Sequence, residues 1–310
     1  MKKVLFLSAL FLVSIHLSAD DESSSITLNH PMGIWVSAGG TIYVADCFNN
    51  RIVQVDDMQG NGLKTYGSSG KTQGKFIHPT MISQDASGLI YVSDYDNDRL
   101  VRIENMEGGG WATYGSRGNG AGQFKGPVMI VAPSGRLYIT DEYNNRIVRI
   151  DDFEGSGWVT YGSRGTEIGE LQKPFSIFVD SGERIFLADV GNHRIVKIDN
   201  MQGLNWTSYG SYGDSTGQFH SPIGVRTDRE GRIYIVENGN HRIVRIDDMS
   251  GRGWTAFGEK GSGVGCFNYP SGLCISPDHR IYVADRFNNR IVRIDDMTGF
   301  NWTEFPPPTD

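Results

Sequence analysis

A proline that returns at an almost constant interval constrains this chain more than any other feature. It occupies Pro31, Pro79, Pro127, Pro174, Pro222 and Pro270, which are spaced 48, 48, 47, 48 and 48 residues apart. Each proline is followed by four short runs rich in Ile, Val, Tyr and Trp and bounded by Gly, Asn or Asp. This composition is typical of strands rather than helices. The chain is therefore built from six copies of one repeat of about 48 residues.

Four short antiparallel strands cannot bury both faces of their own sheet. When such sheets are arranged radially, each one covers its neighbour, and closing the ring removes most of the exposed edges. We therefore predict an all-β fold, a six-bladed β-propeller of four-stranded antiparallel blades. The six repeats form a single domain that spans residues 20–310.

The first nineteen residues are predicted to be a signal peptide. Lys2 and Lys3 precede a mostly apolar stretch over 4–17, and Ser18-Ala19 offers small residues for cleavage before Asp20. The alternative is a membrane anchor, but the apolar stretch is short for a span. We expect an exported protein, either periplasmic or secreted, that is not inserted in a membrane after cleavage.

Charge and cysteine content narrow the class of partner. Without residues 1–19 the chain carries 27 basic and 36 acidic residues, a net charge of −9, and it has no basic run. Such a surface does not favour nucleic acid, which is held by clustered Lys and Arg. We expect a monomer. Of the three cysteines, Cys47 and Cys266 fall in loops of neighbouring blades, so a disulfide that closes the ring stays open as an alternative.

The repeat also resembles a known family. It runs Pro-x-Gly-Ile, then Ile-Tyr-Val-Ala-Asp, then Asn-His-Arg-Ile-Val, with copies at Asn192-His193-Arg194 and Asn240-His241-Arg242. This pattern is similar to the NHL repeat over roughly residues 26–305. The resemblance implies a six-bladed propeller and, for many such propellers, a role as an interaction module. Ile26-Thr27-Leu28 could add to the last blade and latch the ring, although Trp302–Phe305 already supplies a fourth strand there.

Strand direction sorts the loops onto two faces. If each first strand starts at an upper face, the Asn-x-Arg loops and the glycine-rich loops between blades also lie there. The acidic pairs such as Asp56-Asp57 and Asp151-Asp152 fall on the underside. We expect ligands at the upper face over the central channel, because its loops are the longest and the most varied.

Residues that recur in every copy are predicted to hold the blades together, and residues that break the pattern are better functional candidates. The recurring residues are Asp at the end of the second strand (46, 94, 141, 189, 285), Arg after it (51, 99, 146, 194, 242, 290) and Trp at one strand position (111, 158, 206, 254, 302). The aspartates are expected to cap loop amides and the arginines to pair with them or with a neighbouring blade. The tryptophans are expected to be packing residues.

Histidines beside the blade proline raise the question of a metal site. His30 and His78 directly precede the proline in adjacent blades, and His220 stands one residue earlier in blade five. Converging histidines could hold Zn²⁺. Peptidyl-amidoglycolate lyases, which are related to NHL propellers, use channel histidines with a zinc ion, so the resemblance implies the same option here. The alternative is an ordinary loop-to-strand junction. We expect no cofactor, with Zn or Ca as the ions to consider otherwise.

Blade five is irregular. Glu237 replaces the usual Asp, and Arg226 puts a charge in an innermost strand. We treat Glu237, Arg226 and His241 as catalytic candidates that could form an anion-binding or acid/base group. The alternative is a local salt bridge. The ligand-binding candidates are Trp35, Lys173, Tyr269, Arg117 and Arg164.

These observations favour a non-enzymatic, extracytoplasmic binding scaffold that presents its upper face to a protein, peptide or glycan. One alternative is a metal-dependent lyase or hydrolase at the top of the channel, using His30, His78 and His220, with Glu237 or Arg226 assisting. Another is a purely structural envelope component. Convergence of the histidines on a common point would favour the enzyme.

Overall fold

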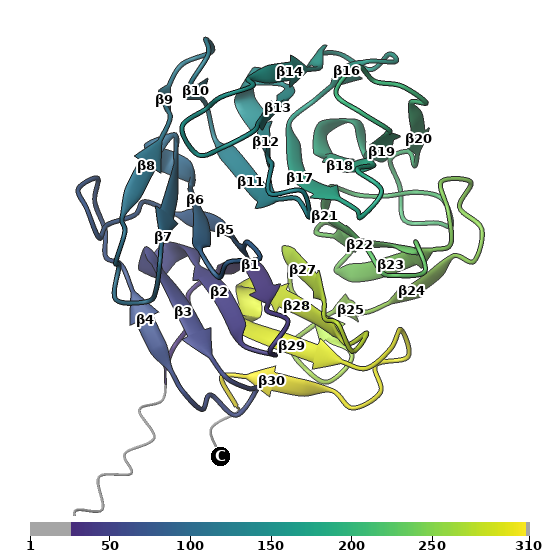
Figure 1. The fold of residues 1–310 in the computed structure, drawn as a ribbon. Helices are drawn as coiled ribbons and strands as arrows, with labels where there is room; N and C mark the ends of the chain where they lie inside the picture. Colours follow the sequence, from purple (N-terminus) through teal and green to yellow (C-terminus); the bar gives the residue numbers. More distant parts are fainter. Residues whose placement is uncertain (1–25, 308–310) are drawn as a thin grey trace, which may run out of the picture.

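Alternating apolar residues fold the six repeats into six separate four-stranded sheets. The computed structural model describes residues 26–307, and each of its six large sheets is antiparallel with its strands in sequence order. These sheets form a propeller, and the predicted fold class and blade count are confirmed (Figure 1). The predicted signal peptide over 1–19 lies outside the described residues.

Every blade takes all four of its strands from its own repeat. Blade 1 holds β1 (Pro31–Val36), β2 (Ile42–Asp46), β3 (Arg51–Val55) and β4 (Lys64–Tyr66); blade 2 holds β5 (Pro79–Gln84), β6 (Ile90–Asp94), β7 (Arg99–Ile103) and β8 (Ala112–Tyr114). Blade 3 holds β11 (Pro127–Val131), β12 (Leu137–Asp141), β13 (Arg146–Ile150) and β14 (Val159–Tyr161); blade 4 holds β17 (Pro174–Val179), β18 (Ile185–Asp189), β19 (Arg194–Ile198) and β20 (Thr207–Tyr209). Blade 5 holds β21 (Pro222–Thr227), β22 (Ile233–Glu237), β23 (Arg242–Ile246) and β24 (Thr255–Phe257); blade 6 holds β27 (Gly272–Ile275), β28 (Ile281–Asp285), β29 (Arg290–Ile294) and β30 (Thr303–Phe305).

Short parallel ladders brace three of the loops that enter a blade. They are β9 (Ser116–Arg117) with β10 (Gln123–Phe124), β15 (Ser163–Arg164) with β16 (Glu170–Leu171), and β25 (Glu259–Lys260) with β26 (Cys266–Phe267). After the second strand of five blades the chain makes one 3₁₀ turn, at Cys47–Asn49, Tyr95–Asn97, Glu142–Asn144, Val190–Asn192 and Arg286–Asn288.

The hydrophobic core lies between blades. One cluster joins Val44 and Val53 of blade 1 to Ala284 and Ile291 of blade 6, and comparable clusters fill the other gaps. Four of the tryptophans that directly precede the fourth strands pack on a buried Phe of the entering loop, with ring centroids 5.4–5.5 Å apart: Trp111, Trp158, Trp254 and Trp302. Trp206 packs instead against the cluster that contains Leu171. The predicted packing role of the tryptophans is confirmed.

The ring closes by packing rather than by strand exchange. In Figure 1, β1 lies beside β27, which it contacts. This contact is so close that a Cβ on Gly272 would lie 2.1 Å from the carbonyl oxygen of Met32. Residues 26–28 form no strand, so the predicted strand addition is wrong. Leu28 instead fills the slot of the entering loop and packs in the same cluster as Phe305. The reason is that β30 already pairs with β29.

Candidate functional site

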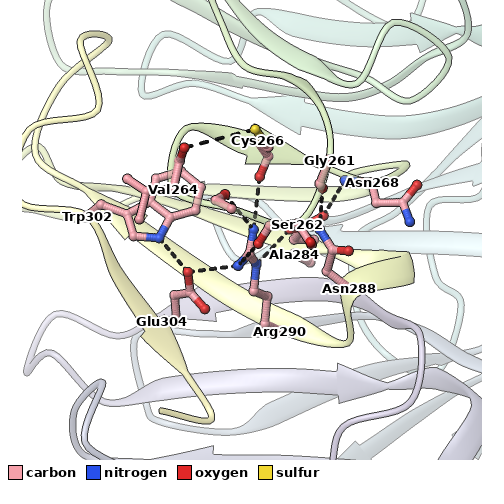
Figure 2. Close-up of polar contacts among 12 residues, drawn as sticks. Gly261, Ser262, Val264, Cys266, Asn268, Ala284, Asn288, Arg290, Trp302 and Glu304 are labelled. Atoms are coloured by element: carbon pink, nitrogen blue, oxygen red, sulfur yellow. Dashed lines mark hydrogen bonds and ion pairs between the residues drawn. The ribbon is translucent and has the colours of Figure 1, made fainter. Parts of the chain in front are cut away.

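The recurring Asp and Arg fix the loops of the upper face. In blade 1, Asp46 accepts a hydrogen bond from the backbone amide of Asn29 (2.7 Å) and pairs with Nε of Arg51 (2.7 Å). Figure 2 shows the same network in blade 6. There Arg290 donates to the carbonyl oxygens of Ser262 (2.7 Å) and Cys266 (2.9 Å), which lie in the loop that enters the blade. The predicted structural role of both residues is confirmed.

In blade 5, Glu237 takes the place of the recurring Asp and makes the same contacts. Its Oε1 accepts from the amide of His220 (3.0 Å), and its Oε2 pairs with Nε of Arg242 (2.5 Å). Burial raises the pKa of this carboxyl, while Arg242 acts in the opposite direction. Glu237 is therefore held in the same loop-fixing position as its counterparts.

The middle residue of each Asn-x-Arg loop links one blade to the next, a role that sequence reasoning missed. Its side chain accepts a hydrogen bond of 2.9–3.1 Å from the amide of the residue before the next blade's proline. The acceptors are Asn50, Asp98, Asn145, His193, His241 and Asn289, all with φ between 52° and 57°. The sequence could have indicated this role, because this position always holds Asn, Asp or His. These residues carry a hydrogen-bond acceptor close to the backbone and are enriched at positive φ.

His241 is such a linker. Its Nδ1 accepts the amide of Tyr269 (3.0 Å), as Nδ1 of His193 accepts that of Ser221 (3.1 Å). Accepting at Nδ1 requires the neutral ring with its proton on Nε2. Burial lowers the pKa of both histidines, with further lowering from nearby positive charge. Both rings are thus kept neutral.

A cavity of about 280 Å³ opens at the upper end of the channel. Its floor is formed by residues that directly follow blade prolines, namely Met32, Thr80, Phe175 and Ile223. Its rim is polar and aromatic: Phe48, His78, Tyr95, Asp96, Glu142, Lys173 and Arg286. Most of the rim comes from the first two positions of the 3₁₀ turns, which vary among the repeats. We call this cavity and its rim the upper mouth.

Charges of both signs meet in the upper mouth. The hydroxyl of Tyr95 donates to Glu142. Burial raises the pKa of Glu142, and the charge of Lys173 partly offsets this. Nδ1 of His78 lies 2.5 Å from the carboxylate of Asp96. Burial lowers the pKa of Arg286. The mouth can therefore hydrogen-bond to both anionic and cationic groups.

Beside the upper mouth, six rings form a continuous band, which we call the aromatic arc. It runs through His78, Phe48, His30, Phe287, Tyr269 and His241, with successive centroids 4.9, 4.4, 4.7, 5.1 and 4.4 Å apart. Phe48, Phe287 and Tyr269 are 41%, 44% and 37% exposed. The guanidinium of Arg286 lies 5.3 Å from the Phe287 centroid and 5.8 Å from that of Phe48. The arc crosses blades 2, 1, 6 and 5.

The structure does not bring the three metal candidates together. His30 and His78 lie on either side of Phe48, within the aromatic arc. His220 packs instead on Tyr212, with the ring centroids 5.2 Å apart. Within residues 26–307, no three His, Cys, Asp or Glu side chains are grouped closely enough to hold a metal ion. This donor set does not fit the Zn²⁺ or Ca²⁺ considered above.

The ligand-binding candidates separate into three places. Lys173 lines the upper mouth and Tyr269 belongs to the aromatic arc. Arg117 and Arg164 are exposed in the outer ladders β9 and β15, and Arg117 pairs with Asp98 (3.2 Å). Trp35 lines the channel at its underside end.

Two alternatives that the sequence left open are excluded by the structure. Arg226 does not pair with Glu237, because in the hairpin of β21 and β22 Arg226 stands opposite Tyr234 and Glu237 stands opposite Pro222. The two charges thus lie at opposite ends of the sheet. The disulfide between Cys47 and Cys266 does not form either: both are free, and Cys47 is buried while Cys266 is partly exposed.

Comparisons with known proteins agree with the fold. The family model of the NHL repeat matches residues 219–246 and 267–294. A comparison with curated proteins found no significant match. No helix within the described part of the chain is long and apolar enough to cross a membrane.

Solved structures of several activities share the architecture. Virginiamycin B lyase from Staphylococcus aureus matches with a TM-score of 0.62 and 18% identity over 92% of this chain and 88% of that one. A gluconolactonase from Xanthomonas campestris matches with a TM-score of 0.62 and 14% identity over 83% of each chain. An auxiliary nutrient binding protein from Bacteroides thetaiotaomicron matches with a TM-score of 0.63 and 16% identity over 86% of this chain and 69% of that one. These identities support a common fold alone.

Proposed function

Because the chain is a six-bladed β-propeller of NHL repeats, we propose that it is a binding protein whose upper mouth and aromatic arc hold a peptide or protein segment. The observation that carries this proposal is the convergence of non-repeating residues on one end of the channel. Tyr95, Glu142 and Arg286 occupy the first position of the turn after the second strand, which differs in every blade, and they line one cavity. Phe48, at the second position of its turn, lines the same cavity and recurs only as Phe287. Repeated residues hold the blades, so the residues that differ are free to specify a ligand.

Backbone strain at the upper mouth supports a binding role for this end of the channel. The residue before the blade proline has φ of 49° in His30, 50° in His78, 49° in Lys173 and 50° in Tyr269, whereas Gly126 fills the same slot in blade 3. A side chain at positive φ costs about 1 kcal/mol that glycine avoids. Strain of this kind gathers at functional sites. Five blades keep a side chain in this slot in spite of the cost, and four of the five belong to the aromatic arc or the upper mouth; the fifth is Ser221, with φ of 53°.

The chemistry of the mouth favours a peptide over a glycan. Partly exposed Phe48, Phe287 and Tyr269 offer apolar area that binds with little loss of side-chain entropy. Glu142 and Lys173 place opposite charges within the same cavity. Backbone and side-chain groups of a peptide can satisfy both charges, whereas a neutral sugar leaves buried charge less well compensated.

Selection of peptides from a random phage-displayed library tests the proposal. Peptides recovered on the wild-type protein should bind the Phe48→Ala/Phe287→Ala variant at least about tenfold more weakly, the loss expected for aromatic hot spots. The matched control is Phe300→Ala, which removes an exposed Phe (61%) from a turn on the underside. An equal loss of peptide affinity in the control variant would place the binding site elsewhere. If no peptide were selected and a glycan array gave ligands, the proposed ligand class would be wrong.

The proposal includes export, which rests on the basic and apolar pattern of residues 1–19. Mass spectrometry of the protein recovered from the native organism should then give a mature N-terminus near Asp20. A full-length N-terminus would remove this part of the proposal.

A second candidate is a lyase or hydrolase at the same mouth. The observation that favours it is the contact between His78 and Asp96, in which a carboxylate orients an imidazole at the rim of a cavity. Because His30, His78 and His220 do not converge, this candidate is stated without a metal step. Turnover of gluconolactone or of virginiamycin B that is lost in His78→Asn would favour it over simple binding.

A further inference from the structure

A second, larger cavity lies at the underside end of the channel. Its volume is about 910 Å³, and it shares no lining residue with the upper mouth. Its walls are the ends of the first strands and the turns that follow them, including 85–87, 132–135 and 228–231. A cavity of this size can hold a small organic ligand. We call it the lower cavity.

One arginine crosses the channel above this cavity. Arg226 is 5% exposed and lines the lower cavity. Its Nη1 donates to the carbonyl oxygen of Val225 (2.8 Å), and its Nη2 lies 3.7 Å from Sδ of Met81, in the opposite blade. The guanidinium also lies 5.6 Å from the ring centroid of Phe178. A cation is thus held at the end of the cavity, in contact with backbone, sulfur and an aromatic ring.

Among residues 26–307, no carboxylate pairs with Arg226, and the acids of the cavity wall are engaged by other groups. Asp180 pairs with Arg184, and Asp228 and Glu230 both pair with Arg232. Asp85 accepts from the hydroxyl of Tyr91 and from turn amides. Burial without an anionic partner is unfavourable for a guanidinium and lowers its pKa. The arrangement is therefore complementary to an anion supplied from outside the chain.

The cavity wall at the level of Arg226 differs between blades and includes two aromatic residues. The structurally equivalent positions hold Trp35, Ser83, Val131, Phe178, Arg226 and Cys274. Trp35 and Phe178 both line the cavity. Nε1 of Trp35 is buried and has no hydrogen-bond partner within the described part of the chain. A ligand with a flat apolar body can pack on these rings while an oxygen atom accepts from Nε1.

We propose that the lower cavity binds a small organic carboxylate. Its carboxylate pairs with Arg226, and its aromatic or aliphatic body lies against Trp35 and Phe178. This site is independent of the upper mouth and stands at the opposite end of the channel.

Titration calorimetry with 1-naphthaleneacetate and its neutral isostere 1-naphthaleneacetamide tests the proposal on the intact protein. The two probes differ only in the group that faces Arg226. The wild-type protein should bind the carboxylate at least about tenfold more tightly than the amide, as expected for a buried charge-assisted hydrogen bond. Arg226→Met, which keeps the length and apolar stem, should reduce this preference to within about twofold.

Arg252→Met is the matched control, since it removes an exposed cation from an underside turn that does not line the lower cavity and should leave the preference unchanged. The proposal is overturned if the wild-type protein does not prefer the carboxylate, or if folded Arg226→Met keeps the preference. If circular dichroism shows that Arg226→Met is unfolded, the same titrations on Trp35→Leu test the proposal instead. It should weaken both probes by about fivefold and keep their ratio, because it removes wall contacts and no charge. Unchanged binding of both probes by Trp35→Leu would place the site elsewhere.

Discussion

The two linker histidines predict an acid sensitivity that can be removed by a double substitution. His193 and His241 accept a blade-linking amide at Nδ1, the role that Asn50, Asn145 and Asn289 fill elsewhere. Protonation of the ring at Nδ1 would abolish the acceptor. The variant His193→Asn/His241→Asn keeps a hydrogen-bond acceptor at both positions but removes the titratable imidazoles. Asn also tolerates the positive φ of both positions.

The sign of the effect follows from the lowered pKa of both rings. Well above pH 6.5 both histidines are neutral in the folded and unfolded chains, so they contribute no pH dependence. Below pH 6.5 the two histidines become protonated in the unfolded chain. In the folded chain they stay neutral until the pH approaches their lowered pKa. The free energy of unfolding therefore falls on acidification, with a limiting slope of about 1.4 kcal/mol per pH unit for each histidine.

Urea denaturation followed by circular dichroism between pH 8 and pH 5 measures this effect. The wild-type curve should fall more steeply than that of the double variant below about pH 6.5, and the two should run parallel above it. Contributions of carboxylates are common to both proteins and cancel in the difference. Each single variant, His193→Asn or His241→Asn, retains one titrating linker and should give a curve between those of the wild type and the double variant. Parallel curves for wild type and double variant over the whole range would refute the reasoning.

Three further predictions test other parts of the structure. Lys173→Gly should leave the free energy of unfolding within about 1 kcal/mol of wild type, because relief of strain offsets the entropy of glycine, yet it should weaken the selected peptides. Arg290→Lys should lower the free energy of unfolding by about 2 kcal/mol in urea titrations, because an ammonium cannot reproduce the forked contacts to the entering loop. In the folded protein, a thiol reagent should label Cys266 and spare the buried Cys47 and Cys274, whereas all three should react in urea. Burial raises the pKa of Cys47 to about 12, and prompt labelling of that residue would contradict its placement.

The sequence pattern predicts the architecture because each blade depends on local rules. The spacing of the six prolines, the period of the apolar runs and the turn residues each specify the same four strands, and the structure contains them. The recurring Asp and Arg could be assigned to structural roles for the same reason. A residue that appears in every copy has a partner in every copy, as Asp285 and Arg290 show.

The candidate site was only partly predictable, since it depends on which side chains converge across blades. The sequence places His30 and His78 in equivalent slots, but their rings are separated by Phe48, whose direction depends on the 3₁₀ turn. Arg226 and Glu237 belong to one hairpin, yet antiparallel pairing places them at opposite ends of it. The upper mouth combines residues from all six blades, and no single repeat contains its pattern.

Hydrogen exchange measured by mass spectrometry, with and without a saturating selected peptide, tests the central claim most directly. The account predicts slowed exchange in the turns 47–50, 95–98, 142–145 and 286–289, which carry the upper mouth and the aromatic arc. Exchange in the underside turns 85–88 and 228–231 should not change. Protection confined to the underside or to the outer fourth strands would contradict the claim that this propeller binds its ligand at the upper mouth.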